Sequence, residues 1–125
     1  MPPDSRLPLL SGALLAATGV VLGAFGVHGL RSVLSPEALG WWQTAVQWEM
    51  WQAIGLVALG AARIPGARLP AAALLAGTII FSGSLYAMAL TDLRWLGAVT
   101  PIGGALMIGG WAWLAWRLAT APAGP

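Results

Sequence analysis

Two ionisable side chains of this sequence lie inside long apolar runs, where a charged group is costly and usually has a role. Glu49 is the single charged residue of segment 41–62, and His28 comes near the end of the first apolar run. A carboxyl group and an imidazole can share a hydrogen bond, exchange a proton or bind a polar ligand. On a helix, Glu49 and Gln52 share one face and can line a polar seam.

Several hydroxyl groups are expected in the same half of the molecule as these side chains. The predicted polar cluster consists of His28, Glu49, Gln52, Ser82, Ser84, Tyr86 and Thr100. Three interpretations are open. The cluster is a buried network that holds helices in register, or it is a proton or ligand site. Alternatively, Glu49 is simply wet, because its helix begins outside the hydrocarbon core.

The usual catalytic constellations are not recognisable. One histidine without any cysteine cannot supply a zinc site, and no Ser-His-Asp set stands at a convincing depth. The glycine-rich stretch 23–29 lacks the lysine and the strand–loop–helix setting of a phosphate loop. We therefore predict no catalytic residue, no metal and no cofactor, and a protein that is not an enzyme. An enzyme acting on lipid headgroups is the weakest alternative.

The composition indicates which elements position these residues. The chain is 58% hydrophobic and 8% charged, whereas a typical globular domain is about 25% charged. Six arginines and four acidic residues in 125 positions cannot cover the surface of a soluble fold. The net charge is only +2, without a basic cluster, which excludes nucleic acid as a partner. The expected surroundings are membrane lipids.

Four runs are close to the ~20 residues that a membrane-spanning helix needs. They cover 7–30, 41–62, 69–90 and 97–116. None alternates apolar and polar residues as a barrel strand would, so helices are predicted. The first run is longer than the apolar part of a secretory signal peptide, which argues against that alternative. The predicted fold is an all-α, integral membrane four-helix bundle, a single membrane domain over 1–125.

Local signals refine the helix boundaries. Ser35-Pro36-Glu37 has a favoured N-cap, a proline suited to the first helical position and an acidic first turn, so a helix is predicted to begin at Pro36. Thr100-Pro101 is expected to begin the regular part of the last helix. Tryptophans favour the headgroup zone, and five of them lie near the predicted ends of spans: Trp41, Trp42, Trp95, Trp113 and Trp116.

Four spans place both termini on one side of the membrane. Arg6, Arg63, Arg68 and Arg117 fall on that side, and two arginines, Arg31 and Arg94, fall on the other. By the positive-inside rule, the termini are predicted to face the cytoplasm across an inner membrane.

Small residues at helical spacing indicate how the spans pack. The predicted helix-packing positions are Gly19, Gly23, Gly26, Ala73, Gly77, Ala105 and Gly109. Small residues let helix backbones approach closely, which drives association in lipid. These faces are expected to pack the monomer, or alternatively to contact a second copy or a larger membrane complex.

Four ordered motifs resemble a known family. They are GAFGVHGL at 23–30, the segment 40–52, FSGSLY at 81–86 and TPIGG at 100–104. Together they are similar to the domain of unknown function 423 family, small membrane proteins related to transmembrane protein 256. This chain has Trp51-Gln52 where the family usually has an aromatic residue followed by histidine. The resemblance implies a four-helix inner-membrane protein and no particular activity.

The sequence therefore favours a multi-pass membrane protein that acts as a structural or accessory component. The alternative is a proton-linked binder or transporter component for a small molecule or lipid, which would use the predicted polar cluster.

Overall fold

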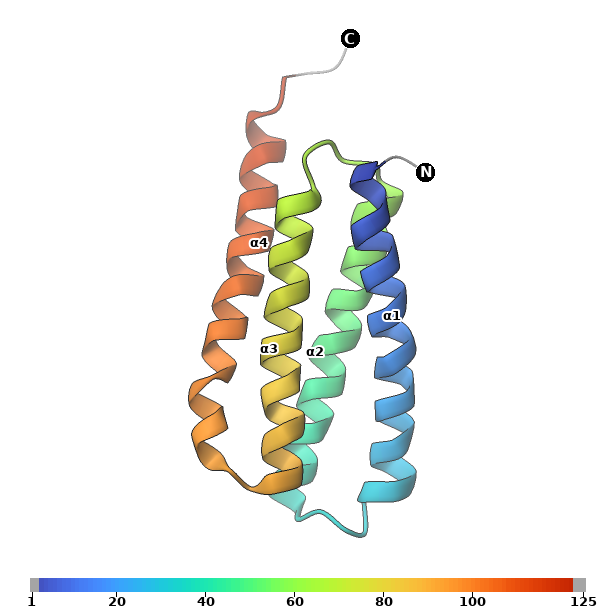
Figure 1. Ribbon diagram of the computed structural model, residues 1–125, viewed down its shortest axis with the longest axis vertical. Coiled ribbons are helices and arrows are strands. Elements are labelled where there is room, and N and C mark those ends of the chain that lie inside the picture. Colours follow the sequence, from blue (N-terminus) through green and yellow to red (C-terminus); the bar gives the residue numbers. More distant parts are fainter. Residues whose placement is uncertain (1–2, 123–125) are drawn as a thin grey trace.

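The computed structural model describes residues 3–122, which are helical apart from short turns (Figure 1). A sharp proline-rich or polar turn ends each apolar run, so the chain folds into consecutive long helices. The elements are α1 (Pro3–Phe25), the π-helical η1 (Gly26–Leu30), α2 (Pro36–Ala61), α3 (Arg68–Thr91), the 3-10 helix η2 (Arg94–Ala98) and α4 (Thr100–Thr120).

The two predicted helix starts agree with the structure. The Ser35 side chain accepts a hydrogen bond of 3.1 Å from the backbone N–H of Ala38, and Pro36 begins α2. Pro101 occupies the first turn of α4, where a missing N–H costs nothing. At the other end of α3, Asp92 adopts a left-handed backbone conformation with φ 57°, and this residue ends the helix.

The helices are ordered in space as they are in sequence (Figure 1). α1 packs on α2, α2 on α3, and α3 on α4, while α1 has a smaller contact with α3. α1 and α4 thus form the two edges, and the Pro3 end of α1 lies at the same end of the molecule as the Thr120 end of α4 (Figure 1). α2 is an inner helix of this arrangement, and its side chains reach both neighbours.

Three helical segments among residues 3–122 have the length and composition of membrane spans. They are Asp4–Leu30, Arg68–Thr91 and Arg94–Thr120. The helix α2, which corresponds to the predicted span 41–62, is not among them. The physical reason is its polar content, because three glutamines and Glu49 interrupt its apolar residues. The structure therefore supports three apolar spans by composition, where four were predicted.

Glycines bring α1 and α2 together at intervals of seven residues. A methyl group on Gly12 would come within 2.8 Å of the Ala53 carbonyl oxygen, and one on Gly26 within 2.7 Å of the Trp42 ring. Between them, Gly19 lies against Met50 and Glu49, and Gly23 against Val46. The predicted positions Gly19, Gly23 and Gly26 thus face α2.

The contact of α3 with α4 uses the predicted Gly77 on α3, but on α4 it uses Gly103 and Gly110 and not the predicted positions. A methyl group on Gly77 would come within 2.7 Å of the Gly103 carbonyl oxygen, and Gly110 packs on Leu74. The predicted Ala105 and Gly109 are exposed instead, and a side chain at Gly109 would enter open space. The predicted Ala73 is partly buried.

Apart from Glu49, the arginine and acidic side chains of residues 3–122 lie toward the two ends of the molecule. At the end with the α1–α2 turn, the Arg94 guanidinium lies 2.6 Å from the Glu37 carboxylate, 3.4 Å from Asp92 and 5.3 Å from the centre of the Trp41 ring. At the opposite end, the α2–α3 turn contains Gly66 at φ 72°, and the Arg117 guanidinium of α4 packs directly on it. A side chain at Gly66 would displace that arginine.

Candidate functional site

The central polar contact of the structure is made by Glu49, whose residue is only 4% exposed. One carboxyl oxygen accepts a hydrogen bond of 2.8 Å from the Tyr86 hydroxyl of α3. The other lies 2.7 Å from the Thr18 hydroxyl of α1. Among the described residues no arginine or histidine forms an ion pair with it. A single carboxyl group therefore joins three helices through two hydroxyl groups.

The Thr18 hydroxyl can either donate a hydrogen bond to Glu49 or accept one from it. Its hydroxyl oxygen lies 2.7 Å from Glu49, 3.0 Å from the Leu14 carbonyl oxygen and 3.2 Å from that of Leu15. A hydroxyl has one proton to donate and two lone pairs to accept. With Glu49 ionised, Thr18 donates to the carboxylate; with Glu49 protonated, the acid donates to Thr18, which turns its own proton to the backbone. Both charge states of Glu49 keep their hydrogen bonds.

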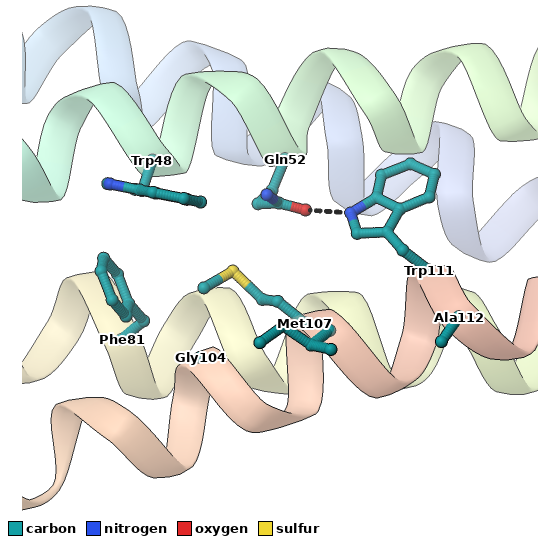
Figure 2. A pocket seen from close by; sticks show the side chains of 8 residues that line it. Trp48, Gln52, Phe81, Gly104, Met107, Trp111 and Ala112 are labelled. Carbon is teal, nitrogen blue, oxygen red and sulfur yellow. Dashed lines mark hydrogen bonds between the residues drawn. The ribbon is translucent and has the colours of Figure 1, made fainter.

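Gln52, one turn from Glu49, connects α2 to α4. Its side-chain oxygen accepts a hydrogen bond of 2.9 Å from the indole N–H of Trp111 (Figure 2). Gly55 makes room for the contact, since a methyl group there would come within 2.7 Å of the Trp111 ring. Gln52 is 6% exposed. The predicted neighbours Glu49 and Gln52 thus turn to opposite edges of the molecule.

The remaining hydroxyl groups of the predicted cluster also bind other helices. Ser82 donates a hydrogen bond of 2.7 Å to the Ala45 carbonyl oxygen of α2. The hydroxyl oxygens of Ser84 and Thr100 are 2.6 Å apart, which fixes the start of α4 against α3. These hydroxyl groups connect α3 to α2 and to α4, but they do not converge on Glu49.

His28 is not part of this interface. It is exposed on the π-helical turn that ends α1, and its side chain makes no hydrogen bond to the described residues. The expected contact with Glu49 does not occur, because Glu49 lies near the middle of α2 and His28 at the last turn of the first helical segment. Within residues 3–122, no three His, Asp or Glu side chains gather in a way that could hold a metal ion.

Three residues that contribute hydrogen bonds here were not predicted as site residues. They are Thr18, Trp42 and Trp111, of which Trp42 donates a 2.8 Å hydrogen bond to the Leu22 carbonyl oxygen. Trp42, which was expected near the end of a span, is 3% exposed because its ring packs against Phe25 and Tyr86. Thr18 could have been noticed as one of two hydroxyl residues, with Ser11, in the apolar run 7–30.

A cavity of about 500 Å³ lies beside Gln52, between α2 and α4 (Figure 2). Trp48 and Gln52 of α2, Phe81 of α3 and Met107 of α4 line it, and Trp111 closes one end. Figure 2 shows the aromatic rings of Trp48 and Phe81 at the other end. The lining is apolar apart from the Gln52 amide. Such a cavity between helices suits a small apolar molecule with few polar groups.

Comparisons with known proteins agree with the resemblance of the four motifs. Residues 22–104 match the family model described as protein of unknown function, DUF423. A UPF0382 membrane protein of Staphylococcus haemolyticus is 42% identical over 112 residues, which cover 87% of this chain and 92% of the relative. The UPF0382 inner membrane protein YgdD of Escherichia coli is 38% identical, with 86% of each chain covered. No solved structure matches the chain.

Proposed function

We propose, from the premise that this chain belongs to the DUF423 family of membrane proteins, that it is a non-enzymatic structural or accessory component of an inner membrane. The observation that carries this proposal is the use of its buried polar groups. Glu49, Gln52, Ser82 and Ser84 each bind a group on a neighbouring helix. Each of these hydrogen bonds joins two helices, which favours a role in packing.

In this proposal α2 crosses the bilayer as the fourth span. Its 26 residues give a length of about 39 Å at 1.5 Å per residue, which exceeds the ~30 Å hydrocarbon core. Two of the four polar groups that lower its hydropathy are shielded, because Glu49 and Gln52 face α1, α3 and α4. The end that holds Arg6, Arg63, Arg68 and Arg117 faces the cytoplasm, in line with the excess of arginine there.

The partner we propose is a second copy of the chain, either alone or as part of a larger complex. The predicted glycines Gly19, Gly23, Gly26 and Gly77 are used inside the monomer, and Ala105 and Gly109 of α4 are small but offer no polar group. The outer face of α2 instead exposes Gln43 and Gln47, one helical turn apart, beside a groove of about 260 Å³. An amide without a partner is costly in hydrocarbon, and amides of two copies can pair with one another.

Native mass spectrometry of the protein extracted with its own lipids tests this role. A defined oligomer or complex is expected for the wild type and for Glu49→Gln, since glutamine can keep both hydrogen bonds of Glu49. The double variant Gln43→Leu, Gln47→Leu is expected to lose it. A monomer in all three proteins, carrying one reproducible small molecule, would contradict the structural role and favour a binding role.

A second candidate, a proton-linked binder or transporter component, is favoured by one observation. The Thr18 hydroxyl can satisfy Glu49 in either charge state, as a site that gains and loses a proton requires. Infrared spectra of the purified protein at a series of pH values test it. A carboxylic acid band that titrates in the wild type and is missing in Glu49→Gln supports proton binding, whereas identical spectra for the two proteins exclude it.

A further inference from the structure

The cavity between α2 and α4 contains a polar group with a fixed orientation. An indole N–H can only donate, so Trp111 selects the oxygen of the Gln52 amide and not its nitrogen. The nitrogen is therefore turned away from Trp111, toward the Trp48 side (Figure 2). The nitrogen has no hydrogen-bond partner among residues 3–122, and the Gln52 residue as a whole is only 6% exposed. The nitrogen itself is not among the buried atoms without a partner, so it is an accessible donor that can bind an acceptor entering the cavity.

The walls around that donor favour a flat, neutral molecule. The rings of Trp48 and Phe81 lie 5.4 Å apart at an angle of 56°, and Met107 supplies a polarisable sulfur next to them. Aromatic rings pack well against tilted or offset rings, and methionine sulfur against ring edges. No charged side chain lines the cavity, so an ionised ligand would lack a partner.

The depth of Gln52 in the bilayer further restricts the class of ligand. Gln52 is nine residues from Ala61, the last residue of α2, and about 5 Å from the midpoint of the helix at 1.5 Å per residue. With α2 across the bilayer, as proposed above, this is close to the membrane centre. Ester carbonyls of bilayer lipids lie in the interfacial region, so they do not reach the amide. A ring compound dissolved in the hydrocarbon does.

We propose that the α2–α4 cavity binds a neutral, lipid-soluble ring carbonyl compound of the quinone type. Its carbonyl oxygen accepts a hydrogen bond from the Gln52 amide nitrogen, and its ring lies among Trp48, Phe81 and Trp111. The proposal concerns binding alone and includes no redox step. Only the argument from the depth of Gln52 depends on the proposal that α2 crosses the bilayer.

The probe is menadione, a methylnaphthoquinone, with 2-methylnaphthalene as the matched ring without carbonyl groups. Each is titrated into the protein in lipid nanodiscs, and the NMR signals of the Gln52 amide and the Trp111 indole are followed. Partitioning into empty nanodiscs is subtracted. We expect saturable binding of menadione, about 5–10-fold tighter than that of the hydrocarbon, which is the effect of about one hydrogen bond. The chain contains no cysteine that menadione could alkylate.

Variants separate the amide from the cavity. Gln52→Met is expected to make the two probes bind equally, while Thr120→Val, at an exposed position remote from the cavity, keeps the preference. If Gln52→Met fails to fold, Ala112→Trp serves instead, because Ala112 is exposed at the cavity and a large ring there blocks both probes. Equal affinity of the two probes for the wild type, or menadione binding that Ala112→Trp does not change, overturns the proposal. The probe titration does not read the oligomeric state, so its failure is distinct from failure of the structural role.

Discussion

Buried polar side chains hold the helices of this protein together in addition to the close packing of its small residues. Glu49 has the largest share, since it bonds to Thr18 on one side and to Tyr86 on the other. Losing one donor leaves a buried carboxyl group short of a partner, whereas losing an exposed hydroxyl changes little.

Tyr86→Phe is therefore expected to lower the free energy of unfolding by about 1–2 kcal/mol. Thr120→Val is the control, because the Thr120 hydroxyl is exposed and bonds only within its own helix. Unfolding in mixed detergent micelles, followed by circular dichroism, measures both. Equal stability of the two variants would mean that the Tyr86 hydroxyl contributes nothing to the folded state.

The sequence predicted the membership of the polar interior better than its pairings. Glu49, Gln52, Ser82, Ser84, Tyr86 and Thr100 were singled out as polar residues in apolar surroundings, and each makes a side-chain hydrogen bond. The partners depend on how each helix is rotated about its axis, which residue types alone do not determine. His28 illustrates the limit, since its π-helical turn leaves it exposed.

At the scale of the helices, small residues set the distance between neighbouring helices. The sequence alone left open which of these small residues face the neighbouring helix. Residues 103–112 of α4 contain glycine or alanine at six positions, so several faces of the helix look equally suitable. The structure uses Gly103 and Gly110, because the contact of Ser84 with Thr100 and that of Gln52 with Trp111 fix the rotation of α4.

Two glycine positions of α4, Gly103 and Gly109, offer a matched test of this rotation. Gly103→Ala would place a methyl group against the backbone nitrogen of Phe81, and we expect a loss of about 1–3 kcal/mol of stability. Gly109→Ala meets open space and is expected to gain about 0.5–1 kcal/mol from helix propensity. Thermal unfolding of the two proteins in the same detergent compares them. Equal effects would place α4 in another rotation.

At the scale of the whole molecule, the open question is the path of α2 through the bilayer. Ser32 lies in the turn before α2, and Ala62 directly follows it. The chain has no native cysteine, so a single introduced cysteine reports one position alone.

With α2 as a span and the termini in the cytoplasm, an impermeant maleimide added outside the inner membrane is expected to label Ser32→Cys and not Ala62→Cys. Labelling of both after membrane disruption is the control for reactivity. Labelling of both positions from the outside would place α2 along the membrane surface, whereas labelling of Ala62→Cys alone would reverse the orientation.

The linear order of the helices has a consequence for how the molecule is made. Each helix packs chiefly on the one synthesised just before it, so its packing partner is already present when it leaves the ribosome. α2 is too polar to be a span by composition alone, yet α1 is already present when it emerges, with a row of glycines and a hydroxyl at Thr18. If α2 crosses the bilayer, as proposed above, α1 would offer it a packing surface during insertion, and a permuted chain that began with α2 would have to insert it without that surface.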